Sequence, residues 1–284
     1  QVSRFDQRRI IEAKAILDEA VEVHRPTHIF GMFSGGHDSL TATHVASQHP
    51  LFSGAAHMNT TIGVPRTRVY VRETSALMGW PLKEYLPPVS YREIVLRHGF
   101  PGPGSHFYMY VRLKERCVEH LIREHKKGRM DRILLVTGVR LDESDRRMGH
   151  VEPIVRNRAK VWVAPILNWS TEDKNEYIDQ MRLPRNPVVD KLCMSGECLC
   201  GSFAKPGEIA EIEAAYPEVA EEIRQLERDA AAAGVHAKWG TRPPKAPPAP
   251  SPQLSMEMCW SCNAKAESAT PPTGSSPVKQ EERE

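Results

Sequence analysis

The chain has 284 residues, 40% of them hydrophobic and 26% charged, which is the composition of an ordinary soluble globular protein. Its 38 basic and 36 acidic residues give a formal net charge of +2, a balance that does not indicate nucleic-acid binding from charge alone. No run of about 18 apolar residues occurs, so we expect no transmembrane helix and no membrane partner.

The beginning of the chain lacks the layout of a signal peptide, and nothing else in the sequence indicates secretion. We therefore expect a cytoplasmic protein. Its six cysteines are then reduced thiols or metal ligands, and not disulfides.

Helical and strand patterns alternate along the first two thirds of the chain. Apolar residues at helical spacing predict a first helix over 10–21, and an apolar run at 27–33 predicts a buried strand that leads into a second helix. The further strand candidates are 52–60, 80–87, 131–140 and 159–169. The further helix candidates are 66–79, 90–99, 106–128 and 170–181. This alternation predicts an α/β fold with a doubly wound, mostly parallel sheet and helices on both faces.

The composition changes near residue 186. A cysteine-rich loop at 186–208 precedes a helical pair at 208–234 that breaks at Pro217. A Pro-rich stretch and a polar tail follow. We expect three parts: a nucleotide-binding α/β domain at 1–185, a cysteine-rich and helical region at 186–240, and a largely disordered tail with a C-x-x-C at 241–284.

The stretch FSGGHDSLTATH, residues 33–44, places two glycines between a strand and a helix. Backbone N–H groups at the start of a helix bind anions, and glycine lets the backbone approach a phosphate closely. The stretch matches neither G-x-x-x-x-G-K-[ST] nor G-x-G-x-x-G. The alternative is a purely structural turn that begins a helix.

SGGHDS resembles the PP-loop, S-G-G-x-D-S, of the ATP pyrophosphatase superfamily. The resemblance implies that the loop holds the pyrophosphate end of ATP or of a related nucleotide. It places five residues around the phosphates: Ser34, Gly35, Gly36, Asp38 and Ser39. His37 stands at the variable position, where it either joins the nucleotide-binding loop or is an exposed loop residue.

Further blocks resemble the phosphoadenosine phosphosulfate reductases of that superfamily and appear in family order over roughly residues 27 to 205. MNTTIG resembles the D-T-G region, with Asn59 in place of the acid, Thr60 matching and Gly63 late. The other blocks are TGVRLDESDRR for G-x-R-x-x-E-S-x-x-R, PILNWSTEDKNEYI for P-x-x-x-W-x-x-x-D-x-x-x-Y-I, and LPRNPV for L-P-x-N-P-L. The resemblance adds Thr60 and Gly138 to the nucleotide site.

A charged segment follows the strand candidate at 131–140. Arginine presents a planar fork suited to phosphate or sulfate, and ligands of such sheets bind where loops leave the strands. We expect Asp38, Arg140 and Arg146 to take part in catalysis. The expected substrate contacts are Lys114, Arg116, Arg140, Glu143 and Arg147. The alternative is a solvated surface whose charges pair with one another.

Five of the six cysteines form two groups, while Cys117 falls within a helix pattern and is expected to pack in the core. The clustered thiols are Cys193, Cys198, Cys200, Cys259 and Cys262. An all-cysteine site suits Zn²⁺ or a [4Fe–4S] cluster, and four of the five would complete it. Unrelated free thiols are the alternative.

The cysteine pattern departs from the reductases, because the chain has neither an E-C-G-x-H tail nor a C-C pair. It looks more like the related PP-loop enzymes of DNA phosphorothioation or nucleic-acid thiolation. That resemblance implies adenylation of a substrate by ATP and Mg²⁺, followed by sulfur transfer. The partners would be a nucleic acid and a sulfur-donor protein such as a cysteine desulfurase. The alternatives are reduction of phosphoadenosine phosphosulfate or adenosine phosphosulfate, and a non-catalytic zinc-bound adapter.

Overall fold

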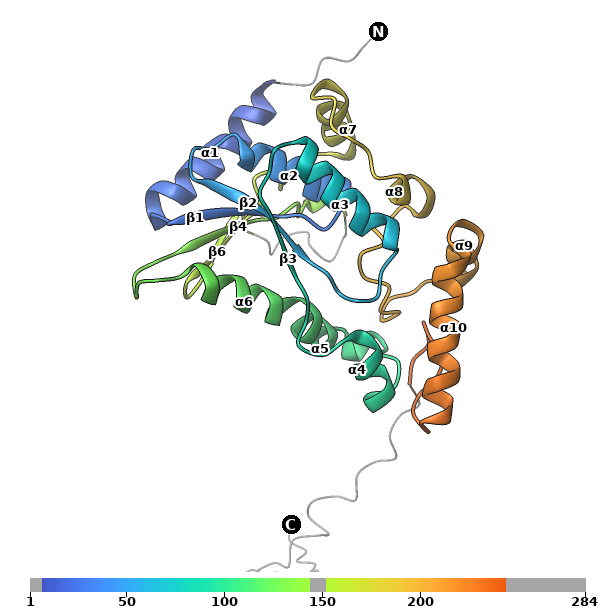
Figure 1. Ribbon diagram of the computed structural model, residues 1–284. Coiled ribbons are helices and arrows are strands. Elements are labelled where there is room, and N and C mark those ends of the chain that lie inside the picture. Colours follow the sequence, from blue (N-terminus) through green and yellow to red (C-terminus); the bar gives the residue numbers. More distant parts are fainter. Residues whose placement is uncertain (1–6, 144–151, 244–284) are drawn as a thin grey trace, which may run out of the picture. The chain divides into compact units, whose positions relative to one another are not determined.

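The computed structural model describes residues 7–143 and 152–243. Their centre is a six-stranded sheet of order β3-β2-β1-β4-β6-β5, in which only β5 runs antiparallel to its neighbour (Figure 1). The strands are β1 His28–Met32, β2 Phe52–Met58, β3 Leu82–Tyr85, β4 Ile133–Val136, β5 Ile154–Asn157 and β6 Lys160–Val163. The predicted α/β class and the mostly parallel sheet are confirmed.

Helices connect the strands and extend beyond them. The helices before β6 are α1 Gln7–His24, α2 His37–Ser47, α3 Pro65–Leu77, α4 Tyr91–His98, α5 His106–Tyr110 and α6 Arg116–His125, and α7 Thr171–Gln180 follows β6. The later ones are α8 Pro187–Leu192, α9 Glu208–Ala215 and α10 Pro217–Ala232. Among these helices, all within the described ranges, none has the length and apolar character needed to cross a bilayer.

Side chains of the central strands alternate between two cores, as the pleat of a strand requires. Ile29 and Leu134 point into a core formed with α1, α2 and α7, whereas Phe30 and Leu135 point to the other face. There they pack against Leu121 and its neighbours on α6. Helices therefore cover both faces, α1 to α3 on one side and α6 on the other (Figure 1).

The strand order reverses between β1 and β4. The chain proceeds from β1 outward to β2 and β3, then returns to place β4 against the free side of β1. The loops that leave the carboxyl ends of β1 and β4 therefore diverge to opposite sides. Such a switch point is where open parallel sheets bind their ligands.

A further apolar cluster joins α4, α9 and α10 to the loop Cys193–Gly201, called here the cysteine loop. The Trp239 indole donates a hydrogen bond to the carbonyl of Leu199 at 2.8 Å, and the Tyr91 hydroxyl donates one to the carbonyl of Cys200 at 2.8 Å. These bonds hold the cysteine loop against α4 and the segment after α10. The predicted domain boundaries stay a prediction.

Local signals account for most of the element boundaries. Ser170 and Asp173 form the expected capping box at the start of α7, and α9 and α10 separate at Pro217 as expected. The helix expected at 106–128 is interrupted by a π-type turn at Val111–Glu115. β5 and α8 were not predicted, because each is short and carries little apolar periodicity.

Candidate functional site

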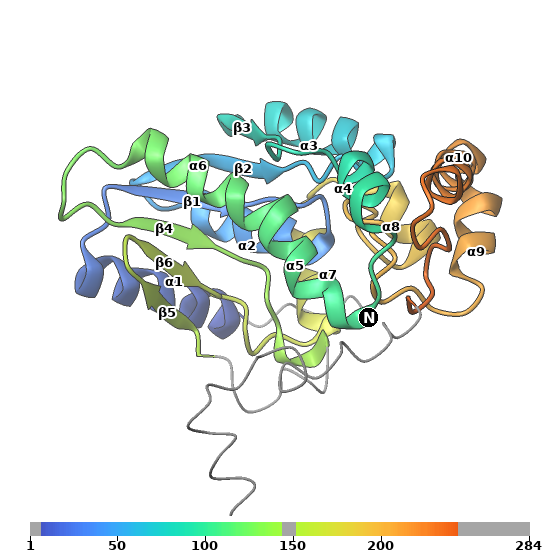
Figure 2. The same cartoon turned by 90° about the horizontal axis from the view of Figure 1, so that it is seen from below.

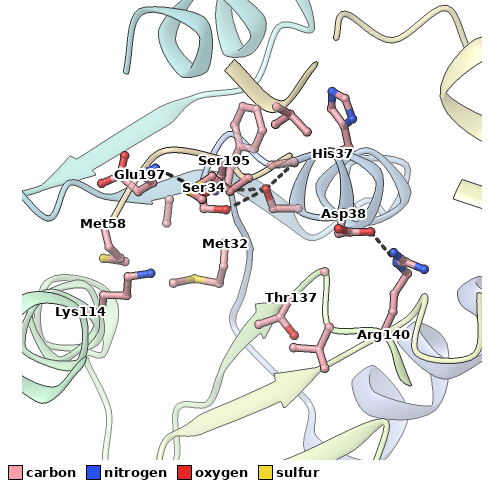
Figure 3. A pocket seen from close by; sticks show the side chains of 18 of the residues that line it. Met32, Ser34, His37, Asp38, Met58, Lys114, Thr137, Arg140, Ser195 and Glu197 are labelled. Atoms are coloured by element: carbon pink, nitrogen blue, oxygen red, sulfur yellow. Dashed lines mark hydrogen bonds and ion pairs between the residues drawn. The ribbon is translucent and has the colours of Figure 1, made fainter. Parts of the chain in front are cut away.

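A cavity of about 750 Å³ opens at the carboxyl ends of β1 and β4 and is called here the main cavity (Figure 3). Its walls come from the segments after these two strands, from the cysteine loop and from the helical run α5–α6. The lining residues used below are Ser34, Gly36, His37, Asp38, Ser39, Lys114, Gly138, Arg140, Lys174, Cys193 and Glu197.

The glycine loop, Ser34–Ser39, lines the main cavity with its main chain and with the side chains of Ser34, His37 and Asp38 (Figure 3). Gly35 has a φ of +83°, a left-handed conformation that favours glycine. The Ser39 hydroxyl donates to the carbonyl of Gly36 at 2.8 Å and accepts from the N–H of Ser34 at 3.2 Å, so the loop closes on itself. Among the residues that the structure describes, no side chain caps the N-terminus of α2. The first N–H groups of this helix therefore remain available to an anion.

The segment after β4 touches the glycine loop directly. A Cβ added at Gly138 would lie 2.4 Å from the carbonyl carbon of Asp38 and 2.5 Å from the nitrogen of Ser39. Because both are backbone atoms, only glycine fits there without moving the loop. The two motifs that the sequence separates by a hundred residues thus meet in one place.

Asp38 is the centre of a charge network at the rim of the main cavity. The Arg140 guanidinium, 3% exposed, donates to Asp38 Oδ1 at 2.5 Å, and Lys174 Nζ lies 3.6 Å from the same oxygen. Arg140 also donates to the carbonyl of Trp169 at 3.1 Å and to Asp142 at 3.3 Å. Arg140 was predicted to take part in catalysis and to contact the substrate. Its guanidinium lines the main cavity and is bonded to protein acceptors, and both predicted roles stay predictions.

Asn186 supports the glycine loop from behind. Its side-chain amide donates to the carbonyl of Gly35 at 2.9 Å, and its side-chain oxygen caps α8 by accepting from the N–H of Val188. Its backbone N–H donates to Nε2 of His37 at 3.2 Å. Burial, and then the charge of Arg185, lower the pKa of His37, so this side chain is a neutral acceptor and not an exposed loop residue.

Glu197 and His57 form a buried pair between the cysteine loop and the sheet. His57 Nε2 lies 3.2 Å from Glu197 Oε2, and its Nδ1 donates to the carbonyl of Phe33 at 2.8 Å. Burial alone would lower the pKa of His57, but the bond and charge of Glu197 outweigh burial and raise it. Glu197 Oε1 also accepts from the N–H of Thr60 at 2.8 Å. Thr60 is fully buried and does not line the main cavity.

The other charged residues predicted for the site do not all lie at the main cavity. Lys114 lines the main cavity on the side opposite Asp38 and Arg140, as Figure 3 shows, whereas Arg116 is exposed and does not line it. Glu143 ends the 3₁₀ turn Leu141–Glu143. Arg146 and Arg147 lie outside the described residues, so their predicted roles stay predictions.

The described cysteines separate into two places. Cys193 ends α8 and lines the main cavity, while Cys198 and Cys200 line a neighbouring cavity of about 310 Å³. A hydrogen bond from Cys198, and a weaker contribution from Ser202, lower the pKa of the Cys200 thiol to about 5, while the pKa of Cys198 is raised. Cys117 is buried in the core against β1 and β4, as its helical position predicts.

The described residues do not assemble a metal site. No group of three or more His, Cys, Asp or Glu side chains in 7–143 and 152–243 is arranged to hold a metal ion. Only Cys198 and Cys200 converge, and Cys259 and Cys262 lie outside the described residues. The zinc or [4Fe–4S] centre therefore stays a prediction, and no chemical step is derived through it. Mg²⁺ also stays a prediction, with Asp38 as the partly exposed carboxylate of the main cavity that could meet it beside phosphates.

Residues 28–200 match the family model of the phosphoadenosine phosphosulfate reductase domain. The chain belongs to this family. The match covers β1 to the cysteine loop, which are the segments that form the main cavity. A comparison with curated protein sequences gave no match.

Several solved structures are similar at low sequence identity. A phosphoadenylyl-sulfate reductase from Candida auris is 19% identical over 63% of this chain and 84% of its own, with a TM-score of 0.47. An FMN adenylyltransferase from Candida glabrata is 15% identical over 65% of this chain and 60% of its own, with a TM-score of 0.48. A U34-tRNA thiolase from Methanococcus maripaludis, solved with its [4Fe–4S] cluster, is 14% identical over 78% and 79%, with a TM-score of 0.42.

Four residues of the site were not singled out from the sequence: Lys174, Asn186, Glu197 and His57. Of these four, Asn186 could have been found from the sequence, because it matches the Asn of the L-P-x-N-P-L block. Lys174 and His57 fall inside ordinary helix and strand patterns. Their roles depend on partners distant in the chain, which a pattern of neighbouring residues does not reveal.

Proposed function

We propose that this chain is an ATP pyrophosphatase that adenylates an oxygen of an acceptor molecule and so prepares it for sulfur transfer. The acceptor oxygen attacks the α-phosphorus of ATP, the α–β anhydride bond breaks, and pyrophosphate leaves. A sulfur nucleophile then displaces AMP from the adenylated acceptor. The acceptor class is a nucleic acid, through a phosphate or a base carbonyl, and the sulfur comes from a donor protein.

One observation carries the proposal: the glycine loop and the cysteine loop line the same cavity. The open N–H groups of α2 supply donors for the leaving pyrophosphate. Lys114 supplies a cation on the opposite wall. The Cys193 thiol lies in the same space, and the Cys198–Cys200 cavity adjoins it through shared Tyr110, Lys114 and Met194.

The chain's own residues position the reactants and offset charge. Arg140 and Lys174 hold Asp38, which fixes the first turn of α2 relative to the β4 segment. Asn186 fixes the carbonyl of Gly35, so the loop is preorganised before nucleotide binds. Phosphoryl and nucleotidyl transfer depend mainly on positioning and electrostatics, which this arrangement provides.

The test is ATP-dependent release of pyrophosphate by the intact, anaerobically purified chain, with nucleic acid as acceptor and a cysteine desulfurase as sulfur source. The proposal expects release of pyrophosphate together with AMP. If folded protein with its full metal content releases none, the proposal fails. Iron, zinc and acid-labile sulfide measured on the same sample decide between a cluster and zinc, and zinc without any nucleotide turnover favours the adapter.

A second candidate is reduction of a sulfonucleotide, favoured by the exposed Cys193 thiol in the main cavity. In that reaction two thiols reduce the nucleotide-bound sulfonate, which leaves as sulfite, and the thiols become a disulfide. Sulfite release from phosphoadenosine phosphosulfate or adenosine phosphosulfate, lost in Cys193→Ser, would establish it. Pyrophosphate release from ATP by the same variant would instead support adenylation.

A further inference from the structure

A second charged cavity, of about 610 Å³, lies at the opposite end of the sheet and is called here the basic cavity. Its residues come from the helical run at 115–122, from the connection between α6 and β4 and from the β5–β6 hairpin. The connection and the hairpin lie at the same end of the sheet in Figure 2. Six of the lining residues are cationic: Lys126, Arg129, Arg132, Arg156, Arg158 and Lys160. Two are acidic, Glu115 and Glu119.

The two acids do not neutralise the cations at the mouth of the basic cavity. Both glutamates pair with the buried Lys160, at 2.7 Å for Glu119. Across the described residues, none of the other five cations forms an ion pair with a carboxylate. Arginine and lysine side chains that converge in this way repel one another unless an anion lies among them.

Local structure positions two of the basic residues, Arg132 and Arg158. Arg132 donates to the carbonyls of Met130 and Asp131 at 2.9 and 3.0 Å, which fixes its guanidinium at the rim. Arg158 occupies the hairpin turn with a φ of 57°, a left-handed conformation that a side chain other than glycine adopts at an energetic penalty. Burial, and then the charges of Arg156 and Arg132, lower the pKa of the neighbouring His24, as expected beside unneutralised positive charge.

We propose that the basic cavity binds the phosphate backbone of a nucleic acid. Five cations spread over a concave space suit several consecutive phosphates better than a single anion. The recess also suits a backbone more than the flat face of a lipid bilayer, because Lys126 and Arg132 are half-buried within it. The partner class is the acceptor class of the proposed function, but the site is separate from the main cavity.

The basic cavity and the main cavity share one helical run and strand β6 as walls. Neighbouring residues on one helical run divide between the two cavities, Lys114 lining the main one and Glu115 the basic one. Strand β6 does the same, with Trp162 lining the main cavity and Lys160 the basic one. A nucleic acid held in the basic cavity would therefore extend along this face toward the nucleotide phosphates.

The experiment measures fluorescence anisotropy of labelled single-stranded and duplex oligonucleotides with the full chain at several salt concentrations, without any nucleotide. The variant Arg129→Gln/Arg156→Gln/Arg158→Gln removes three exposed cations of the basic cavity. The control Lys14→Gln/Arg97→Gln/Arg182→Gln removes three exposed cations elsewhere. We expect the cavity variant to weaken binding by at least about 10-fold and to reduce the slope of log K against log salt by about 2, with the control near wild type.

The corresponding lysine triple variant keeps the charges and should retain most of the affinity, which separates charge loss from misfolding. Equal weakening by the cavity variant and the control would overturn the inference. Absence of oligonucleotide binding by the wild-type chain would also overturn it. The same holds if the wild-type chain binds only inorganic phosphate, or only vesicles of phosphatidylserine and phosphatidylcholine. Because the assay contains no ATP, its failure leaves adenylation untouched, and absence of pyrophosphate release leaves this inference untouched.

Discussion

The two ends of the sheet differ in how their charged side chains are paired. At the carboxyl ends of β1 and β4, Asp38 and Glu197 are each paired, and the anion donors are main-chain N–H groups of the glycine loop. At the amino ends of β4 and β6, the cationic side chains of the basic cavity other than Lys160 lack carboxylate partners in the described part of the chain. This difference supports the two proposals, a nucleotide bound by main-chain groups at one end and a nucleic-acid backbone bound by side chains at the other.

The largest effect is expected from Asp38→Ala. The change leaves Arg140 buried without its closest carboxylate and frees the first turn of α2. Pyrophosphate release should fall by roughly 1000-fold, as for removal of a preorganised catalytic contact. Asp142→Ala is the matched control, because Asp142 is half exposed and also binds Arg140. An equal loss of pyrophosphate release in both variants would show that Asp38 contributes no more to the reaction than Asp142 does.

The buried pair that joins the cysteine loop to the sheet should contribute stability that depends on pH. His57 has a raised pKa in the folded state, so its stabilisation is fully present below the unfolded pKa of about 6.5 and is lost as pH rises through the folded pKa. His57→Gln should destabilise the protein by about 3 kcal/mol at pH 6 and by less at pH 9.

Urea unfolding at both pH values measures this difference. Glu197→Gln removes the other partner and should show the same dependence on pH. A loss of stability that is constant between pH 6 and pH 9 would contradict the assigned pairing. Since Glu197 belongs to the cysteine loop, the result also reports how that loop is held against the main cavity.

Gly138→Ala tests the contact between the two motifs of the main cavity. The added Cβ would overlap the backbone of Asp38 and Ser39, so the glycine loop must shift. Nucleotide affinity should fall roughly 30-fold, about 2 kcal/mol, which is typical of overpacking. Gly104→Ala is the control, because nothing lies within 4 Å of its Cβ position and its φ is not positive. If Gly138→Ala bound nucleotide with wild-type affinity, the contact between Gly138 and the glycine loop would not be needed for nucleotide binding.

The smallest effect distinguishes two neighbouring cations. Lys114→Ala should weaken nucleotide binding about 10-fold, since Lys114 lines the main cavity and charged contacts to phosphate contribute on that order. Arg116→Ala should change it less than about 2-fold, because its side chain is exposed outside the cavity. A larger loss in Arg116→Ala would instead support the prediction that both residues contact the substrate.

The sequence predicted the main cavity where local motifs carry the information. Ser34–Ser39 and Gly138 follow strands whose carboxyl ends meet at the switch point, so their motifs and their places agree. Arg140 also lines the main cavity, but its pairing with Asp38, 102 positions earlier, is not visible along the chain. Thr60 was expected at the nucleotide, but it is buried against Glu197, 137 positions later. Contacts of this range depend on the packed fold and not on spacing.

The most direct test of the central claim is calorimetric titration of the intact, metal-replete chain with ATP and with ADP in the presence of Mg²⁺. The account predicts one saturable nucleotide site per chain in wild type and in Gly104→Ala, and much weaker uptake in Gly138→Ala. Absence of uptake of any adenine nucleotide by the folded wild-type chain would contradict it.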